Sequence, residues 1–533
     1  MEGARDTVTA ALRRAVNACP DRVLVNFHGP SYTYRAFDEA TNSAARGLQQ
    51  LGVKSGQRVA ALLGNGPEVL LSWFAVNKIG AIWVPMNSAY KGEFLRHQLA
   101  DSNARIVVVA SEYLPRLEEI GDELPELEVA LHVGPAPLGR DRKWRTAAFD
   151  ELLTCDRGEM PDPNEPADVM AFVYTSGTTG PSKGCIIPHN AVVNRAEHFV
   201  RSSGRNPGET AWTALPFFHL NAQAYGLVAT ILSLGSLFVA ERFSLSRFWK
   251  DIEESGAVIT NLLGSMIPLI ARAPDSAEMK RCHEQLRFVG GSPFTPELVD
   301  IFKRRFGVSK VGTGVYGMTE AGPLTSLPVG VPNKPGTSGM RNRDFDTRIF
   351  DEHDREVPPN TPGEIVCRPR RRDIMFVGYH NRPDATLAAM RNLWFHSGDI
   401  GKFDEEGYFV FLDRKKDYLR RRGENISSQE VEALFQQHPA ISEVAAYAVP
   451  SDLGEDDLKI AAVLKPGEAL GEADLCKWAI DRMPWFAVPR YIEFMAELPK
   501  TPTGRVEKHK LRAEGRTEAV WDLEASDIVL RKR

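Results

Sequence analysis

Short apolar runs of the buried-strand kind alternate with segments of helical spacing through much of this chain. The strand-like segments are 58–63, 81–85, 236–240, 257–260 and 286–289, and helical spacing covers 37–51 and 67–78. A strand, a helix and a strand at this spacing favour parallel βαβ units. The sequence therefore predicts an α/β fold built on parallel sheets.

The pattern of apolar and turn-forming residues changes after about residue 335. Gly/Pro turns there separate short alternating strands such as 363–367 and 408–412, which is typical of an antiparallel sheet or a small barrel. The charged segment Asp413–Asp417 has a composition typical of a hinge. We expect a large N-terminal domain of mixed α/β sheets with a barrel-like subdomain over residues 1–413, a hinge near Lys416, and a small mobile α+β domain over residues 417–533.

Length and composition limit the class of protein. With 533 residues the chain exceeds the ~250–300 residues at which single cores stop growing, so two or more domains are expected. A net charge of -5 gives no overall field for binding nucleic acid or an anionic membrane surface. The six cysteines stand apart without a CxxC pair, which predicts a reducing compartment and no structural zinc.

Neither a signal peptide nor a membrane span is expected. The N-terminal segment carries Glu2 and Asp6 and lacks the apolar core of a signal peptide. Residues Leu220–Ala240 are uncharged, but their polar side chains and glycines favour a buried helix running into a strand. We therefore expect a cytoplasmic protein. The sequence leaves its oligomeric state open, a homo-oligomer included.

One loop gathers the groups that bind phosphate. Residues 174–184 read YTSGTTGPSKG and follow the apolar run 169–174. Glycines let backbone N–H groups approach an anion, Ser and Thr hydroxyls add donors, and Lys183 adds a cation. The run lacks the spacing of a Walker A loop. We expect a phosphate-binding loop at the edge of a sheet, in preference to a Ser/Thr/Gly surface linker.

Side chains further along the chain suit a nucleotide. Tyr316 could stack on a base, Thr319 could donate to a phosphate, and Glu320 could hold Mg²⁺. Asp399 could accept both hydroxyls of a ribose, and Arg414 follows it just before the expected hinge. Taken singly, Glu320 could be a helix-terminal charge partner and Asp399 a turn residue. Their joint occurrence favours a nucleotide site.

Four motifs in this order resemble the adenylate-forming superfamily, which includes acyl-CoA synthetases, amino-acid adenylation domains and firefly luciferase. They are the phosphate loop, YGMTE at 316–320, SGD at 397–399 and DRKKD at 413–417. The resemblance runs from about Tyr32 to Leu511. Residues 87–95, 422–426 and 501–506 look most like carnitine/crotonobetaine-type CoA ligases.

The resemblance implies ATP, Mg²⁺ and coenzyme A as ligands, and a role for each matching residue. Catalysis would fall to Lys183, Thr319, Glu320 and Arg505, with Glu320 as the metal ligand. The implied nucleotide- and CoA-binding positions are Thr175, Ser176, Gly177, Thr178, Thr179, Gly180, Lys183, Gly291, Ser292, Tyr316, Gly317, Met318, Thr319, Asp399, Arg414 and Gly423. The acid pocket would include His219, Asn221 and Gly314, and Lys416 would be the hinge residue. In isolation, His219 would instead be read as a core histidine.

One position departs from the family pattern. The motif P-K-T-x-x-G-K appears as PKTPTGR at 499–505, so Arg505 stands where the family has the lysine of the adenylation step. Arginine keeps the positive charge but replaces a compact ammonium with a planar fork. Lys508, three residues further on, is an alternative cation.

The resemblance implies an ATP-dependent acid–CoA ligase, which forms an acyl-adenylate with release of pyrophosphate and then an acyl-CoA thioester with release of AMP. The alternatives are a stand-alone adenylating enzyme that passes the acyl group to a carrier protein or an amine, and a non-catalytic nucleotide or acyl-adenylate binding protein. The sequence does not identify the acid. The pocket candidates suit a small or partly polar acid; they are Asn221, Asn261, Gly264, Met266 and Gly314.

Overall fold

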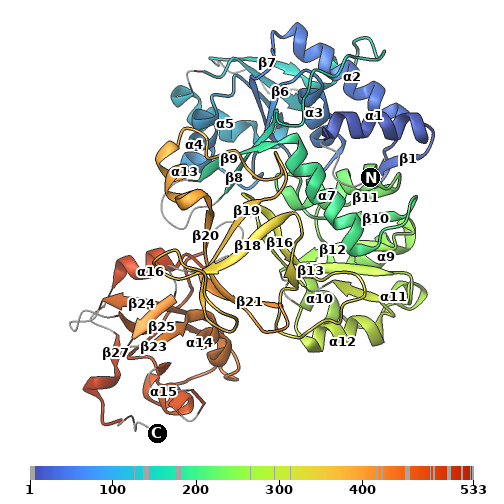
Figure 1. The fold of residues 1–533 in the computed structure, drawn as a ribbon. Coiled ribbons are helices and arrows are strands. Elements are labelled where there is room, and N and C mark those ends of the chain that lie inside the picture. Colours follow the sequence, from blue (N-terminus) through green and yellow to red (C-terminus); the bar gives the residue numbers. More distant parts are fainter. Residues whose placement is uncertain are drawn as a thin grey trace. The chain divides into compact units, whose positions relative to one another are not determined.

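The computed structural model forms two compact units of mixed α/β structure (Figure 1). It describes residues 6–124, 126–135, 143–175, 182–264, 266–292, 294–312, 314–414, 418–421, 424–450, 456–480, 482–483, 487–500, 506–515, 517, 520–528 and 530. The larger unit is made of Met1–Gly177, Pro181–Thr347 and Cys367–Arg391, and the smaller one chiefly of Arg348–Val366 and Asn392–Arg533. The predicted hinge at Lys416 lies outside the described residues, so the boundary at 413–417 stays a prediction.

The first seven-stranded sheet has the order β7-β6-β5-β3-β4-β8-β9. Its strands are β3 (Arg58–Leu62), β4 (Ile82–Pro85), β5 (Ile106–Ala110), β6 (Val129–Val133), β7 (Arg145–Ala148), β8 (Val169–Thr175) and β9 (Lys183–Pro188). All neighbours are parallel except β8 and β9, which form an antiparallel pair. On its outer side, β9 forms backbone hydrogen bonds with residues 377–380. The expected βαβ units are thus confirmed.

The second seven-stranded sheet has the order β14-β13-β12-β10-β11-β1-β2. Its strands are β1 (Val23–Asn26), β2 (Ser31–Thr33), β10 (Thr210–Thr213), β11 (Ser236–Val239), β12 (Ile259–Leu263), β13 (Phe288–Ser292) and β14 (Lys310–Gly312). Only the β1–β2 pair is antiparallel among these described strands. Strands β12 and β13 run up to three residues further than the sequence predicted, which carries Asn261 and Gly291 into the sheet.

Helices flank both sheets (Figure 1). The α-helices are α1 (Val8–Ala18), α2 (Tyr34–Gln50), α3 (Pro67–Lys78), α4 (Gly92–Ser102), α5 (Leu114–Ile120), α6 (Phe149–Leu152), α7 (His189–Ser203), α8 (Ala229–Leu232), α9 (Leu245–Ser255), α10 (Met266–Arg272), α11 (Ala277–Arg281), α12 (Pro296–Arg305), α13 (Pro383–Ala389), α14 (Ser428–Phe435), α15 (Glu472–Ile480) and α16 (Lys508–Glu514). Short 3-10 helices cover η1 (Ser111–Tyr113), η2 (Gly121–Glu123), η4 (Arg391–Leu393) and η6 (Leu523–Ala525).

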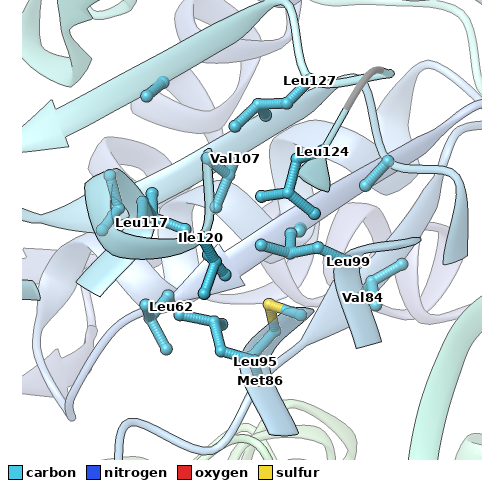
Figure 2. Close-up of a cluster of buried hydrophobic side chains, with 14 of the residues drawn as sticks. Leu62, Val84, Met86, Leu95, Leu99, Val107, Leu117, Ile120, Leu124 and Leu127 are labelled. Carbon is cyan, nitrogen blue, oxygen red and sulfur yellow. The ribbon is translucent and has the colours of Figure 1, made fainter. Parts of the chain in front are cut away.

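One core cluster holds the helices against the first sheet. Leu95 and Leu99 are one helical turn apart on α4, so both face the same side, where Figure 2 shows them beside Leu117 and Ile120 of α5. Each fully buried leucine contributes about 1.5–3 kcal/mol relative to an exposed one. Strand residues such as Val107 complete the cluster, which fixes the helices on the strands.

The segment expected as a buried helix running into a strand behaves largely in that way. Residues Ala222–Val228 form a π-helix, η3, which continues into α8 and then β11. The sequence did not predict that this helix would be a π-helix, which is wider than an α-helix. Among the described residues, no helix is both long and apolar enough to cross a membrane.

Smaller sheets complete the fold. One three-stranded antiparallel sheet joins β15 (Val315–Met318), β16 (Gly322–Ser326) and β17 (Met340–Arg341). A four-stranded sheet joins β18 (Phe345–Phe350), β19 (Gly363–Pro369), β20 (Phe395–Phe403) and β21 (Phe409–Arg414). The predicted strands 363–367 and 408–412 correspond to β19 and β21.

The C-terminal part has its own α+β core. Its strands are β22 (Tyr418–Arg421), β23 (Glu424–Ser427), β24 (Ile441–Pro450), β25 (Asp456–Leu464), β26 (Tyr491–Phe494) and β27 (Trp521–Asp522). Buried apolar residues from α14, α15 and these strands form one cluster, in which Phe435, Ile460 and Leu475 are fully buried. The predicted fold class, a large mixed α/β N-terminal part followed by a smaller C-terminal one, is confirmed.

Candidate active site

The carboxyl ends of the parallel strands in the second sheet bring several predicted residues together. Asn261 on β12 lies opposite Gly290 on β13, and Leu262 lies opposite Gly291. Gly290 in turn lies opposite Gly312 on β14. Ligands of open α/β sheets bind at this edge. The register therefore collects acid-pocket and adenine-flanking positions that are far apart in sequence.

Glycines at this edge are required by close packing. A Cβ atom on Gly291 would lie 2.2 Å from the carbonyl oxygen of Leu262, and one on Gly312 would lie 2.6 Å from the ring of Phe288. Neither backbone nor buried ring has room to move, so a larger residue would displace the strands. Of these two glycines, Gly291 is a position that the sequence assigned to the nucleotide.

The turn between β15 and β16 carries Thr319 and Glu320. Gly317 pairs with Pro323 and Met318 pairs with Gly322 beside it, and a Cβ atom on Gly317 would lie 2.3 Å from the carbonyl oxygen of Gly322. Arg195 of α7, which is buried, donates to the carbonyl oxygen of Thr319 at 2.7 Å. Burial lowers the pKa of Arg195 to about 10, which leaves the guanidinium charged at neutral pH. The turn is therefore tied to the helix behind it.

Glu320 is joined to the phosphate-loop lysine through a tyrosine that the sequence did not single out. The Tyr379 hydroxyl donates to Glu320 Oε1 at 2.8 Å. The ammonium of Lys183 lies 4.3 Å from the centre of the Tyr379 ring, within cation–π distance. Burial and the Glu320 charge raise the pKa of Tyr379 well above its ordinary value, so the hydroxyl stays a donor.

The backbone holds Tyr379 in this position. It forms an antiparallel bridge with Cys185 of β9, and its N–H donates to Thr386 Oγ1 at 2.9 Å. Phe376 N–H donates to the carbonyl oxygen of Glu320 at 2.7 Å. One short segment thus contacts both the strand that carries Lys183 and the turn that carries Glu320. Tyr379 and Glu320 are 59 positions apart, and no local motif marks the tyrosine.

The phosphate loop joins β8 to β9 at the edge of the first sheet, as predicted. Thr175 pairs with Lys183, and the Thr175 hydroxyl donates to the Lys183 carbonyl at 3.4 Å. The predicted positions between these strands, Ser176, Gly177, Thr178, Thr179 and Gly180, lie outside the described residues.

The two residues predicted to bind ribose face each other. Asp399 on β20 and Arg414 on β21 are direct partners in the antiparallel register. Asp399 is buried, and its N–H donates to Ser397 Oγ at 3.1 Å. Gly398 has a φ of 71°, and its N–H donates to Glu364 Oε1 at 3.0 Å. The strand register therefore brings together a carboxylate and an arginine position that the sequence separates.

The predicted acid-pocket residues are only partly assembled. Asn261 Nδ2 donates to Asn221 Oδ1 at 2.7 Å, which links η3 to β12. His219 is exposed, with its ring centre 4.6 Å from that of Phe218. A Cβ atom on Gly314 would lie 3.0 Å from the backbone nitrogen of Gly339. The pocket roles of these residues stay predictions.

Lys508, the alternative cation near the C-terminal motif, already contacts other side chains. Lys508 Nζ lies 2.7 Å from Glu432 Oε1 and donates to Ser428 Oγ at 2.6 Å. Its side chain is only 14% exposed, which argues against a free catalytic ammonium. Arg505, Lys416 and Gly423 lie outside the described residues.

Comparison with known proteins agrees with this arrangement. The sequence model of the AMP-binding enzyme family matches residues 12–380, and that of the AMP-binding enzyme C-terminal domain matches residues 430–505. The chain therefore belongs to the AMP-binding enzyme family. This confirms the recognised class of adenylate-forming enzymes.

Relatives within the family are CoA ligases. The crotonobetaine/carnitine–CoA ligase of Salmonella arizonae is 30% identical over 494 residues, covering 90% of this chain and 93% of that protein. The enzyme of the same name from Salmonella typhimurium is 28% identical over 499 residues, with the same coverage. The predicted likeness to this branch is confirmed.

Solved structures share the fold. The anthranilate CoA ligase AuaEII, in complex with anthranoyl-AMP, superposes with a TM-score of 0.84 at 24% identity, covering 96% of this chain and 97% of its own. ATP-bound MatB from Rhodopseudomonas palustris superposes with a TM-score of 0.82 at 23% identity, covering 95% of this chain and 99% of its own.

Proposed function

We propose that this chain converts a small carboxylic acid into its CoA thioester in two steps. The enzyme class predicted from the sequence, an ATP-dependent, AMP-forming acid–CoA ligase, is confirmed by the family match and by the relatives. The choice of acid, the residues that perform each step and the Mg²⁺ site are proposals. They rest on the geometry described above.

In the first step, a carboxylate oxygen of the acid attacks the α-phosphorus of ATP. The bond to the bridging oxygen breaks and pyrophosphate leaves, so the acid becomes an acyl-adenylate. Little covalent help is needed, since catalysis of such transfers is mainly positioning and charge neutralisation. Lys183 would neutralise the departing phosphates, Thr319 would donate to the α-phosphate, and Arg505 would contact both reactants.

The observation that carries this proposal is the contact chain from Lys183 through Tyr379 to Glu320. A cation and a carboxylate from separate elements are held at one place by a tyrosine that contacts both. Glu320 Oε1 accepts the hydroxyl, and a carboxylate is a ligand that suits Mg²⁺. When bound, the ion would neutralise charge on phosphate oxygens.

The rest of the nucleotide would contact the other predicted positions. Gly291 and Ser292 with Tyr316 would flank the adenine. The position of Gly291 beside Leu262 at the carboxyl ends of β12 and β13 supports this, because ligands of open α/β sheets bind at that edge. Asp399 and Arg414 would bind the ribose, which their facing register supports.

In the second step, the sulfur of coenzyme A attacks the acyl carbon of the adenylate. The acyl–phosphate bond breaks, AMP leaves, and the thiol proton passes to solvent. Gly423 would lie beside the pantetheine arm, and a rotation at Lys416 would exchange the two half-reactions. A cytoplasmic location suits these substrates, and all six cysteines are free thiols.

ATP–pyrophosphate exchange over a panel of short carboxylic acids tests the proposal, followed by detection of AMP and acyl-CoA. We expect acid-dependent exchange and a thioester with free CoA. Exchange without a thioester would instead support transfer to a carrier protein or an amine. No exchange, with ATP still bound in calorimetry, would support a binding protein.

A further inference from the structure

A small cavity lies at the carboxyl end of the second sheet, between η3 and strands β10 and β12. Asn221 and Tyr225 line it from η3, and Thr260 and Asn261 line it from β12. Its volume is about 10 Å³, which is close to the space of one water molecule. The cavity therefore admits one small polar atom and no alkyl chain.

One residue that lines the cavity, Thr260, has a buried hydroxyl without a partner in the part of the chain that the structure describes. Thr260 is 1% exposed, and within the described part of the chain no hydrogen-bond partner reaches its Oγ1. Valine would fill the same space on a strand without the penalty of an unpaired buried hydroxyl. A group of a ligand accounts for the threonine, because it would supply the missing partner.

Neighbouring amides offer both kinds of hydrogen bond. The bond from Asn261 Nδ2 to Asn221 Oδ1 engages one nitrogen and one oxygen. An asparagine carries two N–H donors and one carbonyl acceptor, so this pair retains the amide nitrogen of Asn221 and the carbonyl oxygen of Asn261. With the Thr260 hydroxyl, the cavity can serve a group that both donates and accepts.

The electrostatic setting excludes a cationic group. Of the described residues that line the cavity, none is ionised at neutral pH. Burial raises the pKa of Tyr225, and the nearby Arg195 charge opposes this shift, which places a positive charge close by. An ammonium entering the cavity would lose its water without gaining a counter-charge. The cavity therefore favours a neutral polar group over an ammonium.

We propose that this cavity selects a short carboxylic acid whose far end bears a neutral hydroxyl or carbonyl oxygen, with Thr260 as the residue that recognises it. The inference rests on the proposed function, because it assumes that the acid is adenylated at this edge of the sheet. It adds the class of the acid, a hydroxy or oxo acid, and excludes alkyl and ammonium acids.

The test uses ATP–pyrophosphate exchange with acids of three to six carbons. For each length, the ω-hydroxy acid, the unsubstituted acid and the ω-amino acid are compared. At the best length we expect kcat/KM for the hydroxy acid to exceed both others by about tenfold or more. In Thr260→Val this preference falls to near unity, while Thr260→Ser retains it and the KM for ATP is unchanged.

Thr347 provides a matched control. It lies on β18, is 2% exposed and also has a hydroxyl without a partner among the described residues, but it does not line the cavity. Thr347→Val should keep the hydroxy-acid preference. Equal rates for the three acids, or a preference that survives in Thr260→Val, would overturn the inference and leave the ligase intact. Absence of exchange with every acid would overturn the proposed function as well.

Discussion

Removing the Tyr379 hydroxyl tests whether the contact chain from Lys183 through Tyr379 to Glu320 serves catalysis. Tyr379→Phe keeps the ring beneath the Lys183 ammonium and deletes only the 2.8 Å hydrogen bond to Glu320. A hydrogen bond to a charged group contributes about 1.5–3 kcal/mol. Tyr379 is 8% exposed, so solvent screens the bond little. We expect about 2 kcal/mol, which corresponds to a roughly 30-fold loss of kcat/KM in adenylation.

The assay is ATP–pyrophosphate exchange at a series of Mg²⁺ concentrations, with thermal unfolding measured in parallel. If the hydroxyl orients Glu320 toward the ion, Tyr379→Phe needs more Mg²⁺ for half-maximal exchange. Tyr34→Phe is the control, because Tyr34 is fully buried and donates to the backbone carbonyl of Gly235 at 3.0 Å. A lower melting temperature for Tyr379→Phe with unchanged exchange and Mg²⁺ dependence would refute the reasoning.

Three further changes have expected outcomes. Glu320→Gln should abolish Mg²⁺-dependent exchange yet keep a native melting curve, since the amide oxygen still accepts from Tyr379; near-normal pyrophosphate release would contradict this. Arg505→Lys should raise the adenylation rate by about tenfold, or ~1.4 kcal/mol; an unchanged rate, with Arg505→Ala inactive, would mean that arginine is competent. Burial lowers the pKa values of His189 and His198 from 6.5 to about 4. The unfolded chain binds more protons between these values, so the free energy of unfolding should fall as the pH drops from 6.5 to 4, by about 1.4 kcal/mol per pH unit for each histidine. Urea unfolding of His189→Met should show a shallower slope, and an unchanged slope would count against the assignment.

Local sequence patterns predicted the fold well where the structure of an element depends on its own residues alone. The helix expected over 67–78 was found as Pro67–Lys78, with proline at its first turn and mostly apolar residues after it. The strand expected over 257–260 instead extends to Leu263. Pairing with β13 sustains this extension, and such pairing is invisible in a single segment.

Some residues of the candidate site could likewise be predicted from local motifs, and others could not. Motifs pointed to the two residues that we propose for ribose, and the antiparallel register of β20 and β21 sets Asp399 opposite Arg414. Tyr379 was missed because its importance comes from a contact with Glu320, 59 positions away. Thr260 was also missed, because only the packed structure shows whether a hydroxyl has a hydrogen-bond partner.

The pairing of β9 with residues 377–380 has a consequence for how the chain folds. β9 is the last strand of its sheet, and Cys185 and Ile187 on it are buried. Three backbone hydrogen bonds from the later segment occupy its outer side, at Gly184 and Ile186. An apolar strand with free N–H and C=O groups is a template for pairing with another molecule. Until the ribosome has delivered residues 377–380, this strand remains such a template, so nascent or truncated chains ending before Val377 should be prone to aggregation.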